Sequence, residues 1–387
     1  MIGFLCVLAA AGLIVALALE GRWLFHLPSL RAMPPPAAGT APRLSIIIPA
    51  RNEEMAIARS VTSAASQAYP DLEVIVVDDG STDATPRILA SLRDDFGPRL
   101  SVHTGRPLAP GWVGKCNACD HGASFARGDW LLFLDADTDA ATGLSAALLA
   151  VAVEQRLDAV SVQPFVETGT LAERLALPAF FRFAMNVFPA MRRFDPEMPE
   201  RDALANGQCF LFRTSAYRAV GGHAAVRDKV LEDVELAHLV RRSGLRYALL
   251  TGYDLIRVRM YRAASEVVDG MGKHAAAGMR LSANRGFLTF ASLFATTVGP
   301  SLLCLAGAAI AAAGDPSGVF GLAAGLGAWA YSAYVWQRAS RPLFGLPAAW
   351  ALAAPMGLLT YGLIAAWGML RSALGLGVRW KGRVYKD

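Results

Sequence analysis

The sequence predicts an α/β domain, built on a mostly parallel sheet with flanking helices and joined to transmembrane helices. From residue 44 to about residue 163, short apolar stretches alternate with helical stretches, which is typical of a doubly wound sheet. Hydrophobic residues make up 54% of the 387 residues, and the mean hydropathy of +0.36 is too high for an ordinary soluble protein. A chain of this length has room for one large domain and several membrane segments.

The chain begins with an apolar segment, residues 2–19, that contains no charged residue and is long enough to cross a bilayer. We expect a transmembrane anchor at residues 1–21. A secretory signal peptide is the alternative, because Ala16-Leu17-Ala18 has the small residues of a cleavage site, but no basic region precedes the apolar part. A stiff, proline-rich linker is expected at residues 22–43.

The main domain is expected at residues 44–285. Five apolar runs in its first half are predicted as strands: residues 44–48, 72–77, 100–103, 130–134 and 159–163. The turn after the first run reads Pro-Ala-Arg-Asn-Glu and is not a glycine-rich loop. This turn argues against a dinucleotide-binding dehydrogenase and against a P-loop enzyme.

Three long apolar segments follow this domain, at residues 287–313, 319–336 and 343–370. They predict membrane segments at residues 286–371, followed by a basic tail at residues 372–387. Pro355-Met356-Gly357 interrupts the third segment and leaves two arms of about 13 residues, each roughly 20 Å long as helix. A re-entrant or interfacial hairpin and a kinked full crossing both fit this pattern, and the hairpin would return the basic tail to the cytoplasmic face.

The stretch 171–194, ahead of the membrane segments, mixes aromatic residues with arginines. A helix that rests on the membrane and a core helix with a basic face both fit this composition.

Acidic residues follow several predicted elements. Asp135 and Asp137 come directly after the fourth predicted strand, Asp79 lies in the turn after the second, and Glu232 and Asp233 lie downstream. Because the carboxyl ends of parallel strands open onto one crevice, we expect these side chains to converge. Asp135 and Asp137 would repel each other unless a hard cation lay between them, and oxygen ligands favour Mg²⁺ or Mn²⁺. The pattern predicts a divalent metal site for a phosphate ligand.

An ordered set of motifs carries a resemblance to a known family. The set comprises Pro49-Ala50-Arg51-Asn52-Glu53, Val77-Asp78-Asp79-Gly80-Ser81, Asp135-Ala136-Asp137 and Glu232-Asp233. Over about residues 44–260 the chain resembles family 2 glycosyltransferases of the GT-A fold, and the ordered set is highly specific. Three further stretches resemble membrane enzymes that glycosylate carotenoids or hopanoids: Gly111-Trp112-Val113-Gly114-Lys115, Ala205-Asn206-Gly207-Gln208 and Trp380-Lys381-Gly382-Arg383.

The resemblance implies roles in binding a nucleotide-sugar donor. Asp79 matches the position that reads the nucleobase edge, and Glu53, in the same turn as Pro49, matches one near the ribose. Asp135 matches the carboxylate that contacts ribose, and Asp137 matches the one that binds the metal. The resemblance thus implies that Asp137 would hold Mg²⁺ or Mn²⁺ against the diphosphate.

Other residues are implied on the acceptor side or next to the phosphates. Asp233 matches the general base that takes the acceptor's proton, with Glu232 beside it. A helix N-terminus lowers a carboxylate's pKa, whereas acidic neighbours raise it. Lys115, at the start of a helical stretch, either offers its ammonium to a phosphate or is a solvated lysine. Further candidates are Gln208, Arg259, Trp380, Lys381 and Arg383.

The expected function is therefore metal-dependent, inverting transfer of a hexose from a UDP- or GDP-linked donor to a membrane lipid such as a carotenoid, a hopanoid or another lipid alcohol. The catalytic domain is expected on the cytoplasmic side of the inner membrane, where sugar nucleotides are made, in a multi-pass protein.

Two alternatives remain at this stage. One is an exopolysaccharide or cell-envelope polysaccharide synthase, although Arg257-Val258-Arg259-Met260-Tyr261 replaces the Gln-x-x-Arg-Trp motif of processive members. The other is a non-catalytic membrane protein that binds sugar nucleotides, which would not need Asp233.

Charge and cysteines exclude other classes. The net charge is +5 and the pI is near 9.0, but no dense basic run or nucleic-acid motif accompanies them, so no nucleic-acid partner is expected. Cys116 and Cys119 form a Cys-x-x-Cys pair, either a redox or zinc half-site or two ordinary helix residues, and no second pair lies at zinc-finger spacing.

Overall fold

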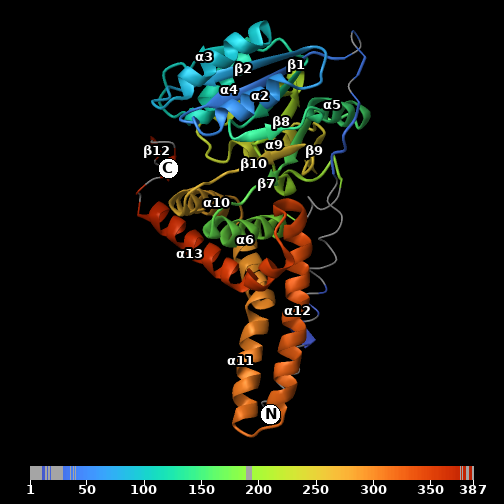
Figure 1. Cartoon of the computed structure of the whole chain (residues 1–387), viewed down its shortest axis with the longest axis vertical. Coiled ribbons are helices and arrows are strands. Elements are labelled where there is room, and N and C mark those ends of the chain that lie inside the picture. Colours follow the sequence, from blue (N-terminus) through green and yellow to red (C-terminus); the bar gives the residue numbers. More distant parts are fainter. Residues whose placement is uncertain are drawn as a thin grey trace.

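The computed structural model describes residues 11–13, 15, 18, 29–34, 36–37, 39, 41–188, 194–374, 376, 378–380 and 383–385. Most of the anchor expected at residues 1–21, and part of the linker expected at 22–43, lie outside these residues. A sheet domain forms one end of the molecule, and a pair of long helices extends away from it at the other end (Figure 1).

A seven-stranded mixed sheet forms the centre of the domain, in the order β3-β2-β1-β4-β8-β6-β9. Its strands are β1 (Leu44–Ala50), β2 (Leu72–Asp78), β3 (Leu100–Thr104), β4 (Trp130–Leu134), β6 (Ala159–Gln163), β8 (Cys209–Arg213) and β9 (Tyr247–Thr251). The five predicted strands are confirmed, some with one or two extra residues. All pairs are parallel except those of β8, which lies antiparallel between β4 and β6 and was not predicted.

Two further sheets are small. One joins β5 (Thr138–Ala140), β10 (Ile256–Val258) and β7 (Phe165–Val166), and the other joins β11 (Val378–Trp380) to β12 (Arg383–Tyr385).

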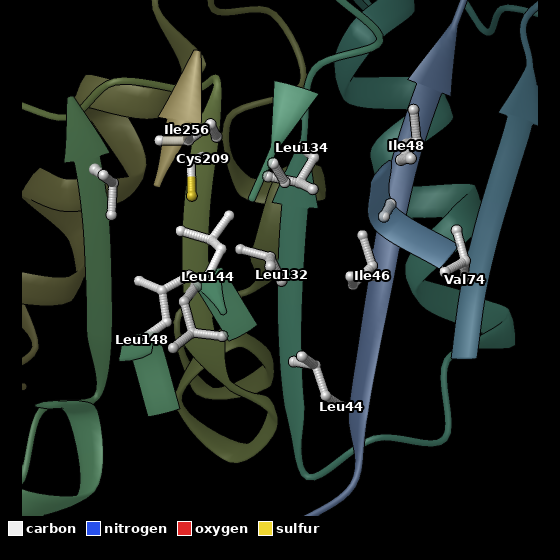
Figure 2. Close-up of a cluster of buried hydrophobic side chains, with 14 of the residues drawn as sticks. Leu44, Ile46, Ile48, Val74, Leu132, Leu134, Leu144, Leu148, Cys209 and Ile256 are labelled. Carbon is white, nitrogen blue, oxygen red and sulfur yellow. The ribbon is translucent and has the colours of Figure 1, made fainter. Parts of the chain in front are cut away.

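Both faces of the central sheet are covered, as a doubly wound sheet requires. Ile46 and Ile48 of β1 pack with α2 (Ile57–Ala65), α3 (Thr85–Phe96) and α5 (Leu144–Glu154) in one buried cluster, part of which Figure 2 shows. Ile47 points to the opposite face, where α4 (Gly114–Phe125) and α9 (Glu232–Arg242) pack. This alternation follows from the two-residue period of a strand. Short helices complete the domain: η1 (Gly97–Arg99), η3 (Glu200–Asp202), α7 (Thr214–Ala219) and α8 (Gly222–Ala225).

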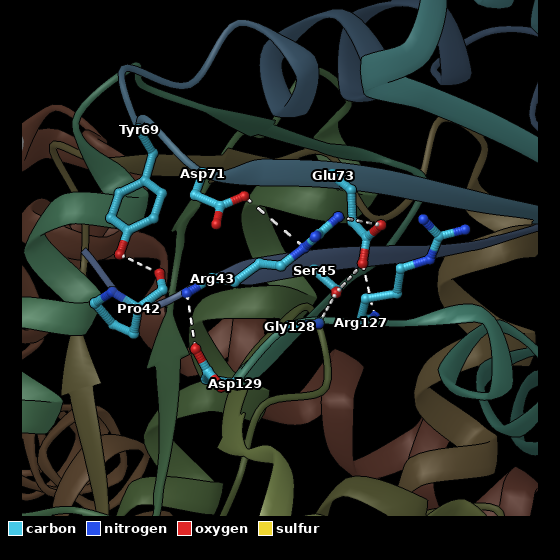
Figure 3. A network of polar contacts seen from close by, with 9 residues as sticks. All are labelled: Pro42, Arg43, Ser45, Tyr69, Asp71, Glu73, Arg127, Gly128 and Asp129. Carbon is cyan, nitrogen blue, oxygen red and sulfur yellow. Dashed lines mark hydrogen bonds and ion pairs between the residues drawn. The ribbon is translucent and has the colours of Figure 1, made fainter. Parts of the chain in front are cut away.

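A polar network ties together the amino ends of the parallel strands (Figure 3). Glu73 of β2 accepts hydrogen bonds from Ser45 Oγ (2.7 Å) and from the Arg127 amide (2.7 Å), and it pairs with Arg43 (3.2 Å). The Gly128 amide donates to Ser45 Oγ at 2.8 Å. Because these contacts close the amino edge of the sheet, the carboxyl ends of the same strands are left to form a site.

Helices α6 (Leu171–Val187), α10 (Ala264–Thr297) and α13 (Ala354–Ala373) lie beneath the sheet domain, and α11 (Gly299–Ala312) and α12 (Ser317–Phe344) run side by side away from it (Figure 1). In the described part of the chain, two helices are long and apolar enough to cross a membrane: Ser317–Phe344 and Ala348–Ala373. The pair Ala283–Thr297 and Gly299–Ala312, bent by 41°, counts as a third if it forms one span.

Pro355 does not divide the last apolar segment into two helical arms, as the sequence led us to expect. Pro355 occupies the first turn of α13, which is continuous to Ala373, and the 3₁₀ helix η4 (Ala348–Ala353) precedes it. Proline is tolerated there because first-turn amides have no partner within the helix. The two-armed hairpin is therefore wrong. The C-terminal strands β11 and β12 nevertheless lie near the sheet domain, away from the far ends of α11 and α12 (Figure 1).

The close packing of glycines between α11 and α12 leads to a prediction. A Cβ added at Gly307 of α11 would lie 2.3 Å from the backbone nitrogen of Leu322, whereas one added at Gly327 of α12 would have no atom within 4 Å. Gly307→Ala should lower the free energy of unfolding by about 1–3 kcal/mol through overpacking. Gly327→Ala should leave it unchanged or raise it, because alanine favours helices. Thermal unfolding in detergent measures both, and equal melting temperatures would contradict the expected packing.

Candidate active site

A cavity of about 350 Å³ opens at the carboxyl ends of the parallel strands and continues between α6, α10 and α13. Its wall has an acidic half and an apolar half. The acidic half contains the predicted residues Pro49, Glu53, Asp79, Lys115, Asp135, Asp137, Gln208, Glu232 and Asp233. The convergence expected from the strand ends is thereby confirmed.

Backbone contacts fix the first two strand ends. The Asp79 amide donates to the Ala50 carbonyl at 2.8 Å, so the turns after β1 and β2 lie side by side. The Arg51 guanidinium donates to the carbonyl oxygens of Asp79 and Gly80. Asp79 itself is 5% exposed, at the position where the resemblance predicts contact with a nucleobase.

An ion triad joins three elements at the centre of the acidic half. The Lys115 ammonium lies 2.7 Å from Asp135 Oδ1 and 2.9 Å from Glu232 Oε1. Burial acts to lower the pKa of Lys115, but the two carboxylates outweigh it and hold the pKa well above its usual value. The Lys115 ammonium thus lies beside Asp135, and the expected metal ion at Asp137 stays a prediction. Lys115 is not a solvated lysine.

Asp233 has the properties of a base near neutrality. Its Oδ2 accepts a hydrogen bond from the Gly207 amide (2.7 Å), and its Oδ1 accepts one from the Val234 amide (2.9 Å). Burial, with the charge of Glu232 next in weight, raises the pKa of Asp233 to about 6. The pKa of Glu232 is lowered, because the Lys115 ammonium outweighs the opposing effect of burial. The predicted helix start at Glu232 is confirmed as the start of α9.

The acidic half offers carboxylate oxygens to a divalent ion. Among the described residues, no three His, Cys, Asp or Glu side chains form a metal-binding group. Asp137 lines the cavity, while Asp135 is engaged by Lys115. Mg²⁺ is usually held by one or two carboxylates together with substrate phosphates and water. The residues present therefore fit an ion that binds together with a diphosphate.

The stretch Asn206-Gly207-Gln208 forms the floor between the two halves. Asn206 Nδ2 donates to Gln163 Oε1 (3.0 Å), and the Gln208 amide donates to Asn206 Oδ1 (2.9 Å). The side-chain oxygen of Gln208 is buried and has no hydrogen-bond partner in the described part of the chain. A buried acceptor of this kind is suited to a donor group on a ligand.

The apolar half of the cavity is formed largely by α6. Phe180 and Phe183 of this helix lie against the ring of Tyr361 from α13, with centroid distances of 5.9 and 5.5 Å. Phe188 and Leu343 line the same half. α6 therefore packs in the apolar core, as one of the two alternatives for its sequence expected, and it also forms a wall of the cavity.

Arg259 does not line the cavity. It pairs with Glu173 at 3.3 Å. Glu173 is fully buried and accepts hydrogen bonds from the amides of Thr170 and Gly169, in the capping box that starts α6. Burial acts to raise the pKa of Glu173, but these hydrogen bonds, above all that from Arg259, hold it below its usual range. Arg259 thus positions the helix that forms the apolar wall.

Three tail candidates stay predictions. Trp380 and Arg383 lie in β11 and β12, for which the backbone alone is described, and Lys381 lies outside the described residues. Cys116 and Cys119 are buried on α4 with raised pKa values, caused chiefly by burial, so they are ordinary helix residues.

Sequence reasoning missed Lys273 and His274 of α10, which line the cavity. Both are flanked by small and apolar residues just ahead of the first membrane segment. Lys273, a single lysine within a run of small and apolar residues, was the signal in the sequence that could have indicated a site residue.

Comparisons with known proteins agree with this architecture. Residues 45–221 match the family described as Glycosyl transferase family 2, so the chain contains a domain of this family. The chain is 29% identical over 242 residues to 4,4'-diaponeurosporenoate glycosyltransferase of Staphylococcus haemolyticus (strain JCSC1435), over 62% of each chain. It is 29% identical over 245 residues to the protein of that name from Staphylococcus aureus (strain USA300), over 61% of each chain. It thus spans about three fifths of the length of these relatives.

A solved structure extends the fold comparison. The mannosyltransferase PcManGT from Pyrobaculum calidifontis, solved in complex with GDP-Man and Mn²⁺, matches with a TM-score of 0.52 and 18% identity. The match covers 95% of this chain and 99% of that chain. The fold is therefore α/β of the GT-A type, as expected.

The Arg259–Glu173 pair generates a prediction. Arg259→Met should lower the free energy of unfolding by about 1–3 kcal/mol, because it removes hydrogen bonds from a buried carboxylate. Affinity for a nucleoside diphosphate should stay near wild type, since Arg259 lies outside the cavity. Arg262→Met changes an exposed arginine three residues away and serves as the control. Thermal unfolding and calorimetry measure the two properties. Loss of nucleotide affinity without loss of stability would place Arg259 in the donor site instead.

Proposed function

We propose that the protein is a membrane-bound, metal-dependent, inverting glycosyltransferase that moves a hexose from a UDP- or GDP-linked donor to a lipid-like acceptor. One observation carries the proposal: a single cavity joins an acidic half at the strand ends to an apolar half formed by helices that continue toward the membrane. A sugar donor and a lipid acceptor need these two environments next to each other.

The acidic half supports the donor role. Asp79, Glu53 and Asp135 lie where a nucleoside would bind across the carboxyl ends of β1, β2 and β4. A divalent ion held by Asp137 and the donor's phosphates would offset the negative charge of the leaving diphosphate. The Mn²⁺ and GDP-Man bound by the fold neighbour, and the family match, support this assignment.

The position and pKa of Asp233 support the role of a base. A carboxylate with a pKa of about 6 is ionised at pH 7 and can still accept a proton as the acceptor oxygen attacks. The amides of Gly207 and Val234 orient it. Attack by the acceptor itself, on the face opposite the diphosphate, inverts the anomeric carbon without a covalent enzyme intermediate.

The apolar half supports a lipid-like acceptor. The cavity reaches along α10 from Lys273 to Gly286, a distance of roughly 20 Å for 13 residues of helix. Aromatic side chains from α6 line it, and such walls bind apolar chains by burying surface. The carotenoid acid in the names of the curated relatives is one acceptor of this class.

The candidate membrane helices support a location in the cytoplasmic membrane, with more than one crossing and with the sheet domain on the cytoplasmic side. Incubating membranes that contain the full chain with a panel of UDP- and GDP-sugars and extracted lipids, then identifying products by mass, tests the proposal. Absence of any glycolipid that depends on Asp233 would overturn it.

The base assignment predicts a pH effect and a turnover effect. Asp233→Asn should lower kcat about 10²- to 10⁴-fold and leave donor affinity near wild type. Because only the ionised carboxylate accepts a proton, wild-type kcat should fall about tenfold per unit as pH drops below about 6. Glu235→Gln, on the same helix but outside the cavity, is the control. A flat profile down to pH 5 would move the base elsewhere.

The metal assignment predicts an effect on binding. Asp137→Ala should weaken the affinity for UDP or GDP in the presence of Mn²⁺ by about 10- to 100-fold, or roughly 1.4–2.8 kcal/mol. Asp139→Ala changes a carboxylate two residues away that does not line the cavity. Calorimetry with and without a chelator provides the measurement. If Mn²⁺ improves nucleotide affinity equally in wild type and in Asp137→Ala, Asp137 is not a metal ligand.

A further inference from the structure

Lys273 of α10 is a half-buried cation in the cavity wall that neither the family motifs nor the base and metal assignments use. It lies between the two halves of the cavity. On one side, the charges of Glu232, Asp233 and Asp135 act on it. On the other side its neighbour His274 lies 5.9 Å from the ring of Phe180, which belongs to the apolar half.

Close helix packing fixes the position of Lys273. A Cβ added at Gly272 would lie 3.3 Å from the Cα of Gly368, and one added at Gly368 would lie 2.3 Å from the Gly272 carbonyl oxygen. This contact presses α10 against α13 at the residue before Lys273. Met271 of α10 is buried and packs with residues of α13 in one apolar cluster. The lysine therefore comes from a rigid helix crossing and is held toward the cavity.

The charge balance of the cavity explains what such a cation is suited to do. Six carboxylates line the described cavity wall, against three lysine and arginine side chains, Arg51, Lys115 and Lys273. An anion that enters this wall meets a net negative field. Lys273 is the cation placed where the acidic and apolar halves meet.

Burial lowers the pKa of Lys273 in spite of the attraction of the Glu232 carboxylate, so the ammonium is held in a poorly solvated place. His274 next to it has a pKa lowered to about 3 by burial and is neutral near pH 7. An ammonium in such a place binds a ligand anion strongly, because charge-assisted hydrogen bonds are the strong ones.

We propose that Lys273 binds the anionic group of a substrate at the junction of the two halves, either a donor phosphate or an acceptor carboxylate. The inference rests on the proposed function, since that function brings such anions into this cavity. Lys273 thereby discriminates among ligands: it favours a lipid acid over the corresponding lipid alcohol if its partner is the acceptor, and it tightens nucleotide binding if its partner is the donor.

The test compares Lys273→Met, which keeps the length and removes the charge, with Lys273→Arg, which keeps the charge. Lys229→Met, at an exposed lysine outside the cavity, is the matched control. The full chain in detergent is titrated with UDP, with GDP, with geranylgeranoic acid and with geranylgeraniol, each in the presence of Mn²⁺. Melting temperature is recorded for every variant.

Lys273→Met should weaken the binding of the nucleotides or of the acid by about 10- to 100-fold, while affinity for the alcohol changes less than about twofold. Lys273→Arg should retain most of the affinity. The arm that changes identifies the source of the anion. Unchanged affinity for both kinds of anion overturns the proposal, and so does equal weakening of acid and alcohol, which indicates a purely structural role.

If Lys273→Met does not fold, loss of anion affinity in a folded Lys273→Arg overturns the proposal and retention supports it. Because these are binding measurements, they remain valid if wild-type membranes transfer no sugar, which would count against the proposed function alone.

Discussion

The Lys115 ammonium, held between Asp135 and Glu232, is the interaction on which the site depends. It connects the end of β4, the start of α4 and the start of α9. Glu232 is buried and Asp135 is half-buried, and without a cation between them their repulsion and desolvation would force one to take up a proton. The Val113 amide, which donates to the Arg227 carbonyl at 2.7 Å, holds the same junction from the backbone side. The triad therefore sets both the shape and the charge of the acidic half.

The triad also separates the roles of two adjacent acids. Glu232 faces Lys115 and has a lowered pKa, so it stays ionised. Its charge, together with burial, raises the pKa of Asp233, which faces the Gly207 amide instead. Adjacent carboxyl groups with pKa values moved in opposite directions are a common basis for acid–base chemistry near pH 7. The helix N-terminus, which favours ionisation, is outweighed at Asp233 because burial is the larger effect.

Much of the donor half could be predicted because its residues sit in local motifs after apolar strands, as Asp79 and Asp137 do. Strand β8 was missed, because an apolar run of five residues gives no sign that it enters the sheet antiparallel. Lys273 and Tyr361 lie far from the motifs in sequence, and packing alone brings them to the cavity. Arg259 was placed in the site by analogy, although its partner, Glu173, lies 86 residues away and belongs to the start of α6.

The two halves of the cavity depend on different parts of the fold. The carboxyl ends of β1, β2 and β4 supply the acidic half, and the network around Glu73 secures the opposite ends of these strands. The apolar half depends on the α10–α13 contact at Gly272 and Gly368 and on the Arg259–Glu173 pair at the start of α6. The C-terminal part of α10 and the helix that follows it, α11, belong to the region proposed to enter the membrane. The wall that carries Lys273 is therefore continuous with that region. Movement of α11 and α12 relative to the sheet would therefore act on the apolar wall through α10 and leave the acidic wall in place.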